Sequence, residues 1–223
     1  VVSHPRMVID AGARSRLRLI ERHTGTAGGA ITNAVTTVQL HDGAEADILR
    51  LQHEHGDAVH LGRLDVVQRA ASRLRVLGVG RGAGIARFEV HVSLTGADAS
   101  AELVGLSAPD PDCRHDTVVA VDHAASRCRS SQRFRSVVAD RARSAFGGRV
   151  IVRPGTKGTD AQQRTDNLLL GPSAQADSRP WLEIFADDVR CNHGSATGRI
   201  DEDALFYLRS RGIDEHTARG LLV

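Results

Sequence analysis

The sequence predicts an all-β protein that ends in a short helical segment. Of its 223 residues, 41% are hydrophobic but only 3% are aromatic, so the core must rest on Val, Leu, Ile and Ala, a composition that favours β-branched stacking. Apolar and polar residues alternate with period two in many short stretches separated by Gly, Asp and Asn. Near the C-terminus this alternation gives way to helical spacing.

The alternation is clearest in Arg16-Leu17-Arg18-Leu19 and in Arg73-Leu74-Arg75-Val76. It predicts strands with one buried face and one face that carries Arg. The expected strands cover residues 6–10, 15–21, 35–40, 46–51, 72–79, 85–92 and 100–106. Many short strands with no helical pattern between them indicate a sandwich, a barrel or a solenoid.

A Gly-Ala pair recurs where strands begin, and we expect its Gly to supply the positive φ of a turn. The pairs are Gly12-Ala13, Gly43-Ala44, Gly82-Ala83 and Gly96-Ala97. Because their spacing is not strictly periodic, they are only a weak repeat signal.

The C-terminal part is predicted to be helical. Leu205 and Leu208 lie on neighbouring turns, and three consecutive acids from Asp201 stand where a helix N-terminus favours negative charge. Gly212 ends this helix, and a second short one can start at Asp214.

The sequence is therefore expected to contain a β domain over residues 1–200 and the start of a helical segment over 201–223.

The net charge of +2, from 29 basic and 27 acidic residues, predicts no nucleic-acid partner. No apolar run is long enough to predict a membrane span. Three cysteines without a C-x-x-C motif favour reduced thiols in a cytoplasmic protein. Because the first residue is not Met, we expect a fragment of a longer chain.

Several His and Cys residues are candidate metal ligands. His53-Glu54-His55 with His60 could bind a metal, but no third ligand is placed, so exposed polar residues near a turn are the favoured interpretation. Cys113 with His115, and His123 with Cys128, each combine a thiol and an imidazole. Their spacing matches no closed zinc site.

The strongest candidate lies in residues 181–194, where a strand is expected to end and lead into a turn. Cys191 and His193 are two residues apart, so in extended geometry both point to the same face. A thiolate and an imidazole suit Fe–S or zinc chemistry, but two ligands do not close a site. Further ligands would have to come from elsewhere in the fold or from another subunit. From spacing alone, a buried structural role for Cys191 is the favoured interpretation.

Residues 183–194, EIFADDVRCNHG, closely resemble the signature of SufD proteins. Residues 145–150 and 159–170 are similar to the core of the wider SufB/SufD family of iron–sulfur cluster assembly scaffolds, so the resemblance covers about residues 115–220. SufB proteins carry a Glu-His-Glu run where this chain has Asn192-His193-Gly194, which favours a SufD-like core fragment. The stretch 155–160 departs from the family pattern and shifts Lys157 by one position, so no role is carried over to that lysine.

The resemblance implies a right-handed parallel β-helix (solenoid) core. It also implies a non-enzymatic scaffold that works with a SufB-like subunit and a SufC-like ATPase. A transient Fe–S cluster would form at the interface with SufB, with His193 as metal ligand and Cys191 beside it, and no cofactor would be tightly bound to the isolated chain. Unpaired strand edges at the ends of a solenoid could also produce a homodimer in isolation.

Two alternatives remain: a β-helix enzyme, and a generic protein-binding solenoid without cluster chemistry. An acyltransferase of the hexapeptide type needs a six-residue repeat, and a polysaccharide lyase needs clustered acidic or basic side chains on one face together with an export signal. The sequence shows neither a six-residue repeat nor an export signal.

Overall fold

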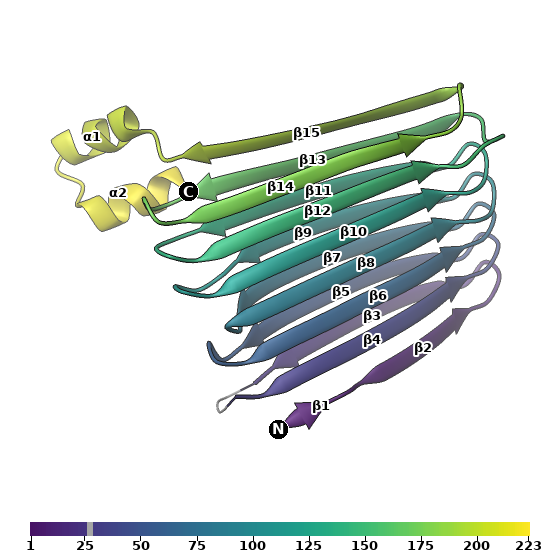
Figure 1. Cartoon of the computed structure of the whole chain (residues 1–223), viewed down its shortest axis with the longest axis horizontal. Helices are drawn as coiled ribbons and strands as arrows, with labels where there is room; N and C mark the ends of the chain where they lie inside the picture. Colours follow the sequence, from purple (N-terminus) through teal and green to yellow (C-terminus); the bar gives the residue numbers. More distant parts are fainter. Residues whose placement is uncertain (26–28) are drawn as a thin grey trace.

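The chain folds into a solenoid of parallel strands (Figure 1). The structure, a computed structural model, describes residues 1–25 and 29–223. From the second strand onward, successive strands alternate between an 8-stranded sheet, sheet A, and a 7-stranded sheet, sheet B, and the described strand pairs are all parallel. The prediction of an all-β, parallel β-helix core followed by short helices is confirmed.

The two sheets face each other, and we call the space between their inward faces the lumen. Sheet A consists of β1 (Val2–Ser3), β2 (Arg6–Ala11), β4 (Ile31–Leu40), β6 (Val59–Gln68), β8 (Ile85–Leu94), β10 (Arg114–His123), β12 (Arg143–Val152) and β14 (Gln175–Ile184). Sheet B consists of β3 (Arg16–Thr24), β5 (Glu45–Glu54), β7 (Arg73–Gly82), β9 (Ser100–Ala108), β11 (Arg129–Val138), β13 (Thr159–Leu169) and β15 (Val189–Arg199). Most strands bury every second residue in the lumen, and its largest apolar cluster contains Leu40, Leu64, Leu74, Leu94 and Leu103.

The corner that leads from sheet A to sheet B repeats one backbone turn. In each copy one residue has a φ between 53° and 68°, and its N–H donates to a carbonyl of the next coil. These residues are Arg14, Gly43, Ala71, Asp98, Arg127 and Gly158. The turn therefore satisfies backbone groups between coils as well as changing the chain direction.

The glycine prediction is only partly right. Gly43 and Gly82 have the expected positive φ of 68°, but Gly12 and Gly96 do not, because Arg14 and Asp98 take the left-handed position at their corners. Gly96 is needed for space instead: a Cβ there would lie 2.0 Å from the backbone N of Ala70.

Two cysteines act as small spacers at the corners. Cys128 follows a left-handed residue, a place held elsewhere by buried Ala44, Ser72, Ala99 and Thr159. At the opposite corner, Cys113 donates its N–H to the carbonyl three residues earlier, as Ala58, Ala142 and Ala174 do. Burial raises the pKa of both thiols. Both cysteines therefore have structural positions, and nothing supports the His115 or His123 pairings as metal sites.

The helical tail begins where the sequence predicts it. Helix α1 (Glu202–Ser210) and helix α2 (Glu215–Leu222) pack Leu205 and Ala218 against Ile200. Asp201 caps α1 and Asp214 caps α2 through side-chain oxygens. Within the described residues, no helix is long and apolar enough to cross a membrane.

Replacing Asp201 by Ala should lower the free energy of unfolding by about 1 kcal/mol, because Oδ1 of Asp201 accepts from the backbone N–H of Asp203 at 2.9 Å. Thermal unfolding followed by circular dichroism measures this change. Asp203→Ala, which keeps the capping carboxylate, is the matched control. Equal effects of the two substitutions would contradict a capping role.

Candidate functional site

The last strand, β15, carries both residues of the candidate ligand pair. Cys191 pairs in register with Ala161, and His193 pairs with Gln163. Because Ala161 and Gln163 are buried in the lumen, Cys191 and His193 lie on the lumen-facing side of β15. The sequence predicts one strand that ends within residues 181–194 and leads into a turn. The structure has two strands there instead: β14 ends at Ile184, and β15, which carries both residues, starts at Val189.

β15 lies at the open end of the solenoid, as Figure 1 shows. Among the described strands, β15 pairs only with β13, and β14 pairs only with β12. Within the part of the chain that the structure describes, no further coil covers the lumen-facing side chains of these two strands, and His193 is exposed. The outer edge of β15 also leaves backbone N–H and C=O groups available to another chain.

The two candidate ligands have different surroundings. Cys191 is half-buried and packs with Val150, Val152 and Leu182. Burial raises the pKa of its thiol, with a smaller contribution from the charge of Asp160, so the thiol holds its proton at neutral pH. The His193 ring is open to solvent. Lys157 lies in the exposed turn before β13, well separated from the pair along the chain.

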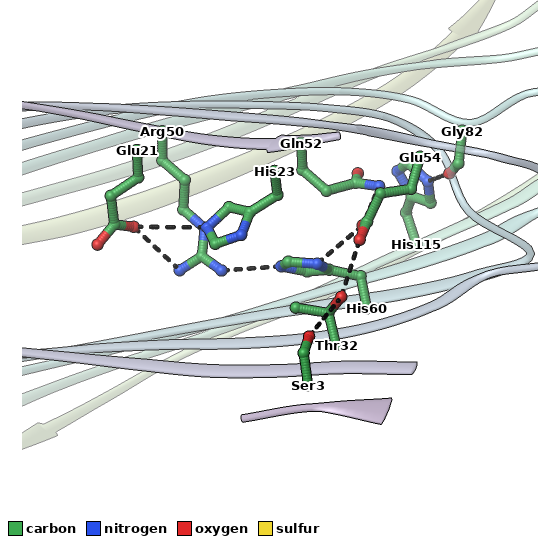
Figure 2. Close-up of polar contacts among 10 residues, drawn as sticks. All are labelled: Ser3, Glu21, His23, Thr32, Arg50, Gln52, Glu54, His60, Gly82 and His115. Carbon is green, nitrogen blue, oxygen red and sulfur yellow. Dashed lines mark hydrogen bonds and ion pairs between the residues drawn. The ribbon is translucent and has the colours of Figure 1, made fainter. Parts of the chain in front are cut away.

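A second group of chemically active side chains lies inside the solenoid (Figure 2). Glu21, Arg50, Glu54 and His60, which we call the lumen cluster, are at most 8% exposed. The interpretation of residues 53–60 as exposed is right for His53 and His55 but wrong for Glu54 and His60. Those two project inward because each pairs in register with a lumen-facing position of its own sheet.

Geometry fixes the protonation of His60. The Arg50 Nη2 lies 2.9 Å from Nε2 of His60, and a guanidinium can only donate, so Nε2 must accept. The ring proton therefore sits on Nδ1, which lies 2.8 Å from Oε2 of Glu54. Burial lowers the pKa of His60, consistent with a neutral ring.

Arg50 carries the positive charge of the lumen cluster, which holds two buried carboxylates. Its Nη1 lies 3.8 Å from Oε2 of Glu21, and its guanidinium stacks 4.4 Å from the ring centroid of Phe88. Burial would raise the pKa of Glu21, but hydrogen bonds from His23 and Thr36 together with the charge of Arg50 hold that pKa below its usual value. Hydrogen bonds and the neighbouring His60 likewise keep the pKa of Glu54 low against the effect of burial.

Next to the lumen cluster is a cavity of about 60 Å³, enough for a few water molecules. Gly78, Gly80 and Gly105 leave this space on sheet B, and Gln52 and His115 line it. His115 is held between Ser107 and the carbonyl of Gly82 at 3.0 and 2.6 Å. Within the described residues, no group of three or more His, Cys, Asp or Glu is arranged to hold a metal.

The sequence contains a signal for the lumen cluster. Glu21 continues the inward phase of Leu17 and Leu19, and Arg50 continues that of Ala46 and Ile48. A polar residue in an apolar phase indicates a buried polar group with partners. Which partners these would be depends on how the coils stack, and a single strand does not carry that information.

The comparisons with known proteins place the chain among assembly proteins. The whole chain, residues 1–223, matches the family described as SUF system FeS cluster assembly, SufBD core domain. The chain is 31% identical over 192 residues to the iron-sulfur cluster assembly protein SufD of Escherichia coli, covering 86% of this chain and 45% of that protein. It is 33% identical over 227 residues to the chloroplastic protein ABCI7 of Arabidopsis thaliana, covering 100% of this chain and 47% of that protein.

A SufBD family protein of Mycobacterium leprae is 38% identical over 175 residues, covering 75% of this chain and 45% of that protein. The chain therefore spans about half the length of the relatives it matches. The match also extends through residues 1–110, where the sequence resembled the family only in style.

Proposed function

This chain belongs to the SufBD core family of SUF-system FeS cluster assembly proteins, and we propose that it acts there as a SufD-like scaffold subunit. In this role His193 contributes one ligand to a nascent cluster that forms against a SufB-like subunit docked on the open end. The observation that carries the proposal is the exposed imidazole of His193 beside the unpaired edge of β15.

A single exposed ligand suits a scaffold that gives its cluster away. Imidazole binds iron, but one protein ligand cannot hold a cluster without others. The remaining ligands would come from the docked subunit, so the site would exist only in the complex and would stay open for release. The cluster is therefore the product of assembly and not a resident cofactor of this chain.

Cys191 takes a secondary place in this proposal. Its thiol is half-buried among apolar side chains and keeps its proton at neutral pH. Ligation through Cys191 would require docking to expose the thiol and lower its pKa. The His193 ring is already exposed, which makes His193 the better candidate.

The proposal includes an ATPase partner of the SufC type as the source of energy, with this chain as a non-enzymatic scaffold. It also places the protein in a reducing compartment, the cytoplasm, where the three free thiols of Cys113, Cys128 and Cys191 would persist. The free edges of β14 and β15 would allow a homodimer when the SufB-like subunit is missing.

The test uses the reconstituted complex of the full-length protein with its SufB and SufC homologues. Replacing His193 by Ala should reduce iron and sulfide incorporation at least about tenfold, since a ligand is lost. His216→Ala, at an exposed histidine of α2, is the matched control and should leave incorporation unchanged.

Two results would count against the proposal. Unchanged incorporation in the His193→Ala complex rules out the ligand role. Failure of the full-length protein to co-purify with the SufB and SufC homologues removes the scaffold role, and would favour a binding solenoid without cluster chemistry.

A further inference from the structure

A row of side chains inside the lumen leads directly to His193. Leu103, Gln132, Gln163 and His193 are register partners on β9, β11, β13 and β15. Gln132 and Gln163 are only 1% and 2% exposed. Nε2 of Gln163 donates to Oε1 of Gln132 at 3.0 Å, so the two amides form a short ladder that runs along the solenoid axis.

The position of the Gln163 amide is restricted by its surroundings. A Cβ at Gly148 of β12 would lie 1.6 Å from Nε2 of Gln163. The glycine therefore leaves the space that lets this side chain lie flat in the lumen. With Gln132 below it and Gly148 across from it, the amide has His193 as its register partner on the last coil.

Among the residues that the structure describes, two atoms of the ladder lack a partner, Nε2 of Gln132 and Oε1 of Gln163, and the second lies on the residue next to the last coil. Oε1 of Gln163 is buried, and no donor within the described residues reaches it. Burying a carbonyl oxygen without a hydrogen bond costs free energy, so we expect this oxygen to find a donor when the protein functions. The residue stacked on Gln163 in the next coil is His193, whose ring carries N–H groups.

A neighbouring row shows that such a bond between the last two coils is geometrically feasible. Four residues further along, Asn167 of β13 donates through Nδ2 to Oγ1 of Thr197 on β15 at 3.1 Å. Asn167 and Thr197 are register partners on the same lumen-facing side as Gln163 and His193. Side chains stacked between adjacent strands lie close enough for polar contact.

We propose that Gln163 is a positioning residue for His193: when the exposed ring turns toward the lumen, Oε1 of Gln163 accepts a hydrogen bond from one ring nitrogen and leaves the other nitrogen free to bind iron. This inference rests on the proposed function, because orienting the ring matters only if His193 is a ligand. The bond selects one tautomer and restricts ring rotation before the partner docks. Ligand orientation of this kind is the usual role of the residue behind a metal-binding histidine.

The test compares two variants that lose the same amide–amide bond. Gln163→Met and Gln132→Met both break the Gln132–Gln163 hydrogen bond, but only Gln163→Met removes the acceptor beneath His193. The readout is the tautomer ratio of His193 in the chain without metal, measured from its ring ¹⁵N shifts at a pH where the ring is neutral. Exposed His216 is the internal reference.

In the wild-type chain the tautomer ratio of His193 should differ from that of His216 by about fivefold, the effect of one ordinary hydrogen bond. Gln163→Met should bring the His193 ratio to that of His216, whereas Gln132→Met should leave it unchanged. Equal ratios for His193 and His216 in the wild type, or equal responses to the two substitutions, would overturn the inference.

Cluster formation separates this inference from the proposed function. In the reconstituted complex, Gln163→Met should reduce iron incorporation about tenfold and Gln132→Met should not. If the tautomer ratio responds to Gln163→Met but iron incorporation is unchanged even in His193→Ala, the hydrogen bond exists and the ligand role is wrong. If His193→Ala reduces iron incorporation but Gln163→Met leaves the tautomer ratio of His193 unchanged, the ligand role holds and the positioning role is wrong.

Discussion

Replacing Arg50 by Met should lower the free energy of unfolding by about 3–5 kcal/mol, because it leaves the buried carboxylate of Glu21 without its ion-pair partner and removes the positive charge near Glu54. Arg50 is 3% exposed, so water cannot substitute for the lost charge. The acceptor nitrogen of His60 also loses its donor. Urea denaturation at neutral pH measures the change.

A surface ion pair provides the matched control for this experiment. Arg75 contacts Asp47 at 2.6 Å, but its side chain is 60% exposed, so Arg75→Met should hardly move the urea midpoint. Adding Glu21→Gln to Arg50→Met should recover part of the lost stability, since one uncompensated charge is then removed. Similar midpoints for Arg50→Met and Arg75→Met would show that the lumen cluster does not stabilise the fold.

Between pH 6.5 and pH 4, replacing His123 by Gln should reduce the acid-induced loss of stability by about 3 kcal/mol. Burial lowers the pKa of His123 from 6.5 to about 4, and its Nε2 lies 2.8 Å from Oγ of Ser130. In this pH range the unfolded chain binds a proton at this position and the folded chain does not. The stability that depends on a neutral His123 is therefore fully present above pH 6.5, and it is lost as the pH falls toward 4.

Urea denaturation at several pH values between 7 and 4 measures this effect as the slope of unfolding free energy against pH. Burial also lowers the pKa of His60 and His115, so the wild-type slope contains their contributions too, and the difference between wild type and His123→Gln isolates one group. His53→Gln, on the exposed face of β5, is the control and should keep the wild-type slope. Parallel slopes for wild type and His123→Gln would contradict a buried neutral His123.

The fold could largely be predicted from the sequence, because each strand has its own local alternation of apolar and polar residues. The expected strand over 72–79 corresponds to β7, Arg73–Gly82, and Gly212 has a positive φ where the first helix ends. The choice between a sandwich, a barrel and a solenoid could not be made from the strand pattern, because all three use the same alternation. It depended on the resemblance of residues 183–194 to a known family.

The interior was harder to predict because the period-two rule assigns Arg to the outside. That is right for Arg16 and Arg18, which are exposed, and wrong for Arg50, which is compensated by a carboxylate from the coil below and a histidine from the facing sheet. Pairing across coils joins residues such as Gln132 and Gln163 that are 31 positions apart. No local pattern in the sequence contains those partners.

The corner positions of two cysteines have a consequence for oxidative stress. Cys128 donates its thiol to the carbonyl of Gly96 at 3.3 Å, and Cys113 is 4% exposed. Peroxide attacks thiolates that it can reach, and neither sulfur is ionised or accessible while the coils stay stacked. Of the three thiols, that of Cys191, half-buried beside the imidazole at the open end, is the most accessible to peroxide in the intact chain. Oxidation of the thiols would therefore fall at the open end and would spare the corners that hold the coils together.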